Sequence, residues 1–226
     1  MVGGAGDDYI DGGAEGAGHD DTLEGGLGND TLIDSGLSSR DWVSYGNASG
    51  SVTVDLQTGA ASGADGDDSL ANIEAVQGSD YNDSLVSSTA GDSLAGGAGD
   101  DTLVSGNTTT TADYLYGGDG DDSLVASTGR NVIEGGAGTD WLDLTAADAG
   151  VDLDMGYTGA QNTGGAGDID LQRDIEVIIG SDYGDTLEGY SGNAETLLGG
   201  AGDDSLVSEG AGDWLDGGGR RRYSLR

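Results

Sequence analysis

The chain has 226 residues, and its 43 Asp and Glu against 7 basic residues give a formal net charge of −36. So acidic a chain is not expected to bind nucleic acid or anionic membranes. With 47 Gly, no Phe and 35% hydrophobic residues, it is poorly suited to a conventional globular core, so metal ions or stacked repeats must add stability. The absence of Cys excludes disulfides and thiolate chemistry and leaves oxygen ligands for any metal. No apolar run approaches the ~20 residues that cross a bilayer, so membrane insertion is not expected.

A short repeat starts at the N-terminus and recurs along the chain. The nonapeptide GGxGxDxUx, in which U is a large aliphatic residue, occurs in full six times. The six copies cover residues 3–11, 25–33, 96–104, 117–125, 135–143 and 199–207. A unit this short cannot bury its apolar face alone, so the copies are expected to stack on one another.

Degenerate nonapeptides lie between the full copies and keep an acidic or amide residue at position six and an aliphatic residue at position eight. Two nonapeptides make one coil of about 18 residues, so successive turns fall on opposite edges of a roll. Glycine-rich and degenerate turns alternate from Gly78 onwards and again from Gly180. We therefore expect one edge with glycine-rich turns and most of the metal, and one edge that binds little metal.

A longer repeat of about 100 residues overlies the short one. Residues 41–86 contain DWVSY, VTVDL and IEAV in that order, and residues 140–188 contain DWLDL, VDLDM and IEVII. This divides the chain into a partial β-roll unit (residues 1–40), a first module (41–139), a second module (140–219) and an Arg-rich tail outside the repeat (220–226). All four segments that follow the two DW motifs are predicted as strands, and Gly interrupts nearly every helix-length window, so no long helix is expected.

The spacing within the nonapeptide suits Ca²⁺. Glycine at positions one, two and four lets the backbone adopt positive φ, so that several carbonyl oxygens turn toward one point, and Asp at position six adds a carboxylate. Ca²⁺ accepts about 6 to 8 oxygens in flexible geometry, whereas Mg²⁺ demands a stricter octahedron. Position eight then points inward and forms aliphatic ladders along a thin core. The residues at this position are Ile10, Leu32, Leu85, Leu103, Leu124, Leu142, Leu187 and Leu206.

The six full motifs resemble the RTX, or haemolysin-type calcium-binding repeat, family, and the resemblance covers most of the chain. It implies an all-β fold, a right-handed parallel β-roll (β-solenoid) with intercalated strand segments, that binds several Ca²⁺ ions. Carried over by motif, the side-chain ligands are Asp8, Asp30, Asp83, Asp101, Asp122, Asp140, Asp185 and Asp204. The turn glycines that go with them are Gly3, Gly4, Gly6, Gly25, Gly26, Gly28, Gly96, Gly97, Gly99, Gly117, Gly118, Gly120, Gly135, Gly136, Gly138, Gly199, Gly200 and Gly202. Asp21, Asp68, Asp92, Asp113 and Asp213 are weaker candidates, and Asn131, Glu195 and Arg222 depart from the pattern.

Crowded carboxylates predict that folding depends on calcium, because the metal-free chain repels itself and bound Ca²⁺ crosslinks the turns. Extracellular calcium modules bind at ~10⁻⁴ to 10⁻³ M, so we expect the chain to fold outside the cell. The first residues, MVGGAGDDYI, lack the features of a secretory signal peptide. The resemblance implies type I secretion and an extracellular or cell-surface location.

The repeat alone leaves two functions open. The first is a structural or self-assembling surface segment. The second is the noncatalytic calcium-binding module of a secreted polysaccharide-active or lipolytic enzyme, or of an adhesin or toxin. Catalysis by the chain is not expected, because His19 is its only histidine and no GxSxG or phosphate-loop motif occurs.

Some residues outside the calcium pattern have two interpretations each. Val86, Val104 and Val125 form an outward apolar row that is either covered or used for lateral self-association, as in a homo-oligomer, or for partner binding. End-to-end assembly is a separate possibility, because the open ends of a roll can stack. Trp42, Trp141 and Trp214 at position seven either pack between modules or stack on sugars.

Overall fold

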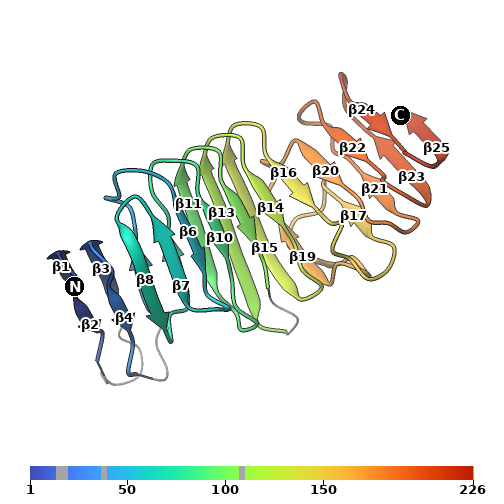
Figure 1. The fold of residues 1–226 in the computed structure, drawn as a ribbon. Coiled ribbons are helices and arrows are strands. Elements are labelled where there is room, and N and C mark those ends of the chain that lie inside the picture. The colour runs from blue at the N-terminus through green and yellow to red at the C-terminus, as the bar shows by residue number, and fades with distance from the viewer. Residues whose placement is uncertain (14–19, 37–39, 107–109, 226) are drawn as a thin grey trace.

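The computed structural model describes residues 1–13, 20–36, 40–106 and 110–225, and for residues 220–225 it describes the backbone alone. The described residues form 25 strands, β1 to β25, and no helix. Figure 1 shows the strands stacked side by side along one long axis, with the two termini at opposite ends. The all-β prediction is confirmed.

Three sheets share these strands. The 9-stranded sheet has the order β1 (Val2–Ala5), β3 (Thr22–Leu27), β5 (Trp42–Ser44), β9 (Ala75–Gln77), β11 (Ser93–Ala98), β13 (Ala112–Asp119), β15 (Arg130–Ala137), β19 (Asp168–Leu171), β18 (Ala160–Asn162). The 12-stranded sheet has the order β2 (Tyr9–Asp11), β4 (Thr31–Ile33), β8 (Gly66–Ala71), β7 (Ala60–Gly63), β6 (Val52–Asp55), β10 (Ser84–Val86), β12 (Thr102–Val104), β14 (Ser123–Val125), β16 (Trp141–Asp143), β20 (Val177–Ile179), β22 (Thr196–Leu198), β24 (Trp214–Asp216). The 4-stranded sheet has the order β17 (Asp152–Asp154), β21 (Thr186–Glu188), β23 (Asp203–Ser208), β25 (Arg220–Leu225). The IEAV and IEVII segments form β9 and β20, as predicted.

The chain passes alternately between facing sheets, and strands of neighbouring coils pair in parallel and in register. Leu85 pairs with Leu103, which pairs with Leu124, which pairs with Leu142. Position eight therefore stacks on position eight through successive coils. This is the parallel β-roll that the nonapeptide spacing predicts.

The core is two facing ladders of aliphatic side chains. All eight residues predicted at position eight are buried. The degenerate nonapeptides supply the opposite ladder with Leu94, Leu115 and Ile133, none of which is exposed. The aliphatic period is thus kept even where the glycines are lost, because every strand must cover a thin core.

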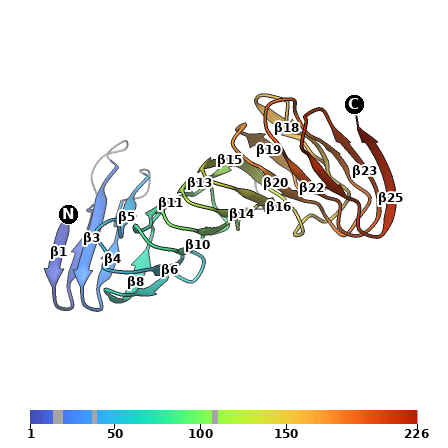
Figure 2. The ribbon, with the colours of Figure 1, turned by 90° about the horizontal axis from the view of Figure 1, so that it is seen from above.

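Two antiparallel meanders interrupt the parallel stacking. In the first module, β6, β7 and β8 lie in the 12-stranded sheet between β4 and β10. In the second module, β18 and β19 end the 9-stranded sheet, and a bridge from Val151 to Gly164 joins them to the β17 end of the 4-stranded sheet. Figure 2 shows β18 and β19 between β15 and the strands β23 and β25.

The two modules are placed on opposite sheets. Trp42 begins β5 in the 9-stranded sheet, whereas its counterpart Trp141 begins β16 in the 12-stranded sheet. An odd number of half-coils therefore separates the two copies. Any feature repeated between the modules changes its side of the roll.

Candidate metal-binding turns

The turns form two edges of the roll. The turns through which the chain enters the 12-stranded sheet form the first edge. The turns through which the chain leaves that sheet form the second edge. Five full nonapeptides lie on the first edge, with their turns beginning at Gly3, Gly25, Gly96, Gly117 and Gly135. The sixth, at Gly199, lies between β22 and β23 on the second edge. The prediction of a single glycine-rich edge is therefore right for the first five turns and wrong for the sixth, because the second module is shifted by a half-coil.

Glycine serves two different purposes within a turn. In every full nonapeptide the glycines at positions two and four have positive φ, as in Gly118 (122°) and Gly120 (137°). Position one does not have positive φ, contrary to the prediction. It must be glycine for lack of space, because a Cβ at Gly96 would meet Oδ2 of Asp101 and lie 2.6 Å from the carbonyl oxygen of Gly117 in the next coil.

The position-six carboxylates stack in a ladder, one per coil. The backbone N–H of Asp83 donates to Oδ1 of Asp101 (2.7 Å), that of Asp101 to Asp122 (2.8 Å), and that of Asp122 to Asp140 (2.9 Å). The same relation joins Asp8 to Asp30 at 2.8 Å. In Asp30, Asp101, Asp122 and Asp140, Oδ1 is thus bound by the preceding coil, and Oδ2 is left for a further ligand.

The second carboxylate oxygen is left unpartnered in every full nonapeptide. It is buried and has no hydrogen-bond partner in Asp8, Asp30, Asp101, Asp122, Asp140 and Asp204. These are the position-six residues of the six full copies. A buried anionic oxygen without a donor is costly, and a cation removes the cost.

Carbonyl oxygens lie close to these carboxylates. A Cβ at Gly135 would lie 2.5 Å from Oδ2 of Asp140 and 2.6 Å from the carbonyl oxygen of Asp174. Among the described residues no three His, Cys, Asp or Glu side chains form a metal-binding cluster. A cation in these turns would therefore take main-chain carbonyls along with the carboxylate, which is the oxygen set that Ca²⁺ accepts. The residues fit Ca²⁺.

In several glycine-poor turns, internal donors bind the second carboxylate oxygen. Oδ2 of Asp113 accepts hydrogen bonds from the hydroxyls of Ser87 and Ser105, each at 2.7 Å. Oδ2 of Asp68 accepts one from the Tyr45 hydroxyl at 2.9 Å. Hydroxyl groups thus take the place that a cation would have.

Asp83 and Asp185, predicted as ligands, also have internal donors. The backbone N–H of Ser181 donates to Oδ2 of Asp185 at 2.7 Å and its hydroxyl donates to Oδ1 at 2.6 Å. Ser79 binds Asp83 in the same way. Asp83 and Asp185 remain predicted ligands, but a cation there would compete with a serine.

Three residues outside the predicted ligand set also have a buried side-chain carboxylate or amide oxygen without a partner. They are Glu195 (Oε2), a residue only 2% exposed, Asp174 (Oδ1), and Asn131 (the amide Oδ1), which stands at position six of a degenerate turn. Glu195 keeps an acid at position six of its degenerate turn, so the sequence contains a signal from which this candidate ligand can be predicted. Asp174 has no place in the nonapeptide pattern, so only the stacking of coils brings it to the edge.

Burial raises the pKa of these carboxylates. The pKa rises to about 7 in Asp101 and Glu195, and to about 6 in Asp122 and Asp140. Burial is the main cause, and neighbouring carboxylates add to it, while the N–H of the preceding coil opposes it. In the absence of metal, the first edge thus holds carboxylates that resist ionisation.

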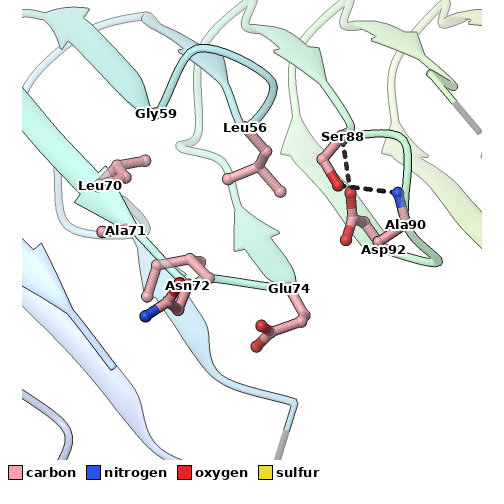
Figure 3. Close-up of a pocket in the computed structure, with 10 residues that line it drawn as sticks. Leu56, Gly59, Leu70, Ala71, Asn72, Glu74, Ser88, Ala90 and Asp92 are labelled. Carbon is pink, nitrogen blue, oxygen red and sulfur yellow. Dashed lines mark hydrogen bonds between the residues drawn. The ribbon is translucent and has the colours of Figure 1, made fainter. Parts of the chain in front are cut away.

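A cavity of about 220 Å³ lies on the second edge beside the first meander (Figure 3). Its lining includes Leu56, Leu70, Glu74 and Asp92. Figure 3 shows Ser88 donating to Asp92, so that carboxylate is already bound. The cavity lining contains neither histidine nor lysine, and its acids belong to the stacked turns.

The tryptophans lie wholly or partly at the surface, and His19 lies outside the described residues. Trp141 and Trp214 are 46% and 65% exposed on the 12-stranded sheet, and Trp42 is half-buried. His19 and part of its turn lie outside the described residues. The backbone register places Arg221, not Arg222, opposite Asp204.

Comparison with family models identifies the repeat. The model of the RTX calcium-binding nonapeptide repeat matches residues 1–32, 77–111, 116–148, 173–193 and 194–219. The chain belongs to the RTX calcium-binding nonapeptide repeat family. The matches include the position-six Asp of all six full RTX copies and leave out both meanders.

RTX repeats bind Ca²⁺, so Ca²⁺ is the ligand of this chain. No curated protein matches the sequence. The described part of this RTX chain contains no helix with the length and hydropathy of a membrane span.

Proposed function

We propose that this RTX chain is a structural segment of an extracellular or cell-surface protein, and that Ca²⁺ drives its folding. One observation carries the proposal. Each full nonapeptide contains one buried carboxylate oxygen without a hydrogen-bond partner, whereas at Asp113, Asp68, Asp83 and Asp185 in other turns internal donors bind both carboxylate oxygens. The chain is therefore built to receive cations at defined turns.

The energetics favour a metal-dependent fold. Many strands are only three residues long, and the core is two side chains thick, so burial alone gives limited stability. An unpaired buried carboxylate costs several kcal/mol, and six of them oppose folding. Ca²⁺ removes this penalty and crosslinks neighbouring coils, so binding and folding become one process.

A structural role accounts for more of the residues than catalysis does. The buried acids belong to the repeat ladder and are committed to neighbouring coils or to Ca²⁺. The outward residues Val86, Val104 and Val125 are half-buried and lie on adjacent strands. Such a row offers a contact for a second copy of the chain.

Sedimentation velocity of the full chain tests this proposal. In chelator we expect a slowly sedimenting, expanded chain, and in millimolar Ca²⁺ a compact species. A further, concentration-dependent increase in Ca²⁺ would identify an assembling subunit, and a compact monomer would identify a spacer. An identical sedimentation coefficient in chelator and Ca²⁺ would refute calcium-driven folding.

Exposed aromatic residues favour a second candidate, a noncatalytic module of a secreted polysaccharide-active protein. Trp141 and Trp214 occupy the same outward row of the 12-stranded sheet, through Val177 and Thr196. Flat exposed indoles can stack on sugar rings. Titration of the folded chain with neutral oligosaccharides should then quench tryptophan fluorescence, and Trp214→Ala should reduce the effect. No quenching at millimolar oligosaccharide would exclude this candidate.

A further inference from the structure

We propose that Asp174, in the loop between β19 and β20, is an additional calcium ligand that completes the row of sites on the first edge. The proposal rests on calcium binding at the full nonapeptides and extends it to a loop that lacks their glycine pattern. Three features of the structure support it: the carbonyl of Asp174, its carboxylate, and the contrast with the first module.

The carbonyl oxygen of Asp174 occupies the place of a repeat carbonyl. At Gly3, Gly78, Gly96 and Gly117 on the first edge, the position-one carbonyl of the next coil covers the glycine, as Gly117 covers Gly96. Gly135 is the last glycine of that row. There the covering atom is the Asp174 carbonyl, 2.6 Å from a Cβ built at Gly135, the same distance as Gly117 from Gly96. The loop therefore acts as the next coil of the stack.

The carboxylate of Asp174 also faces the Gly135 turn. Its Oδ2 accepts a hydrogen bond from the backbone N–H of Gly136 at 3.1 Å, and its Oδ1 is buried without a partner. Oδ2 of Asp140 lies beside the same glycine, 2.5 Å from a Cβ built at Gly135, and this oxygen of the fully buried Asp140 also has no partner. Asp140 and Asp174 thus bring one carbonyl and two unpartnered carboxylate oxygens to a single turn.

The corresponding loop of the first module has a neutral residue in the place of Asp174. Asn72–Ile73–Glu74 corresponds to Asp174–Ile175–Glu176, because Glu74 and Glu176 accept hydrogen bonds from Asp41 and Asp140 in the same way. There the amide of Asn72 donates to the carbonyl oxygen of Asp34 at 2.8 Å. An ionised aspartate has no proton to donate. The exchange of Asn for Asp therefore converts a donor that joins two coils into an anion that needs a cation.

The test is Asp174→Asn in the full chain, which installs the residue of the first module. An asparagine can still accept from Gly136, so shape and hydrogen bond are kept while the charge is lost. Asp148→Asn is the matched control, because Asp148 is exposed in the loop before β17. Equilibrium dialysis with ⁴⁵Ca²⁺ counts bound ions, and Tb³⁺ luminescence excited through Trp141, which follows Asp140, reports on this site.

We expect Asp174→Asn to bind one ion fewer at a Ca²⁺ concentration that saturates the unmodified chain, and to lose the Tb³⁺ signal that Trp141→Phe also removes. Asp148→Asn should keep both. An unchanged ion count and Tb³⁺ signal in Asp174→Asn would overturn the proposal. An unmodified chain that binds no Ca²⁺ would instead overturn the proposed function. Should Asp174→Asn unfold, refolding at a higher Ca²⁺ concentration supports a ligand role, and failure to refold at any concentration contradicts it.

Discussion

Replacing Asp122 by Asn isolates the contribution of one calcium ligand. Oδ1 of Asp122 accepts a hydrogen bond from the N–H of Asp101 at 2.8 Å, and Asn can keep that bond. Only Oδ2, which is buried and unpartnered, is exchanged for an amide group. The substitution therefore removes a cation ligand with little change in volume or packing.

The expected cost follows from mass action. A ligand stabilises the fold by RT ln(1 + [L]/Kd), so a site with Kd of ~10⁻⁴ to 10⁻³ M contributes about 1.4 to 2.7 kcal/mol at ~10 mM Ca²⁺. Loss of the site should lower the free energy of unfolding by this amount at high Ca²⁺, and by about 1.4 kcal/mol less for each tenfold dilution of Ca²⁺ above Kd. Near zero Ca²⁺ the site is empty and contributes no stability, so the cost of Asp122→Asn should vanish. Asn also relieves the repulsion between the carboxylates of Asp122 and Asp140.

Urea unfolding followed by circular dichroism at several fixed Ca²⁺ concentrations measures this dependence. Asp113→Asn is the matched control, because Oδ2 of Asp113 is bound by two serine hydroxyls. Its cost, about 1 to 3 kcal/mol for a disrupted buried hydrogen-bond set, should not depend on Ca²⁺. A cost of Asp122→Asn that stays constant across Ca²⁺ concentrations would refute the reasoning.

Three further predictions concern the turns, pH and the outer face. Gly96→Ala should lower the free energy of unfolding by about 1 to 3 kcal/mol, since its Cβ would press on the Gly117 carbonyl; an unchanged urea midpoint would contradict this. In metal-free buffer, β-type circular dichroism should be stronger at pH 5 than at pH 8. Burial raises the folded-state pKa of Asp101 from 3.8 to about 7, so the folded state holds more protons and loses stability as pH rises through that window. A metal-free signal that grows with pH would have the wrong sign. Val104→Lys should abolish any Ca²⁺-dependent self-association while leaving circular dichroism unchanged, and intact assembly would exclude the valine row as the contact.

The sequence predicts the parts of this molecule that depend on local spacing. Leu103 and Leu124 are buried in register because the nonapeptide period repeats the strand at each half-coil. The same period places Asp101 and Asp122 in one ladder. These features need no knowledge of distant contacts.

What the sequence does not predict depends on contacts between coils. The carbonyl of Gly117 in the next coil helps to exclude a side chain at Gly96, and Oδ2 of Asp68 is bound by the hydroxyl of Tyr45, which follows β5. The full nonapeptides change edge between Gly135 and Gly199, across the second meander, and the nonapeptide motif does not contain that half-coil count. Asp174 reaches the first edge by the same stacking. Residues that are distant in sequence but adjacent in the stacked coils thus determine which carboxylate oxygens remain without a hydrogen-bond partner and can bind a cation.

Calcium-driven folding is tested most directly by far-UV circular dichroism of the metal-free chain during titration with Ca²⁺, with Mg²⁺ as the comparison. A disordered spectrum in chelator, a cooperative change to a β-type spectrum in millimolar Ca²⁺, and little change in Mg²⁺ are predicted, because the turns offer a mixed carbonyl and carboxylate set that suits Ca²⁺. A β-type spectrum that is identical in chelator and in Ca²⁺ would contradict the account.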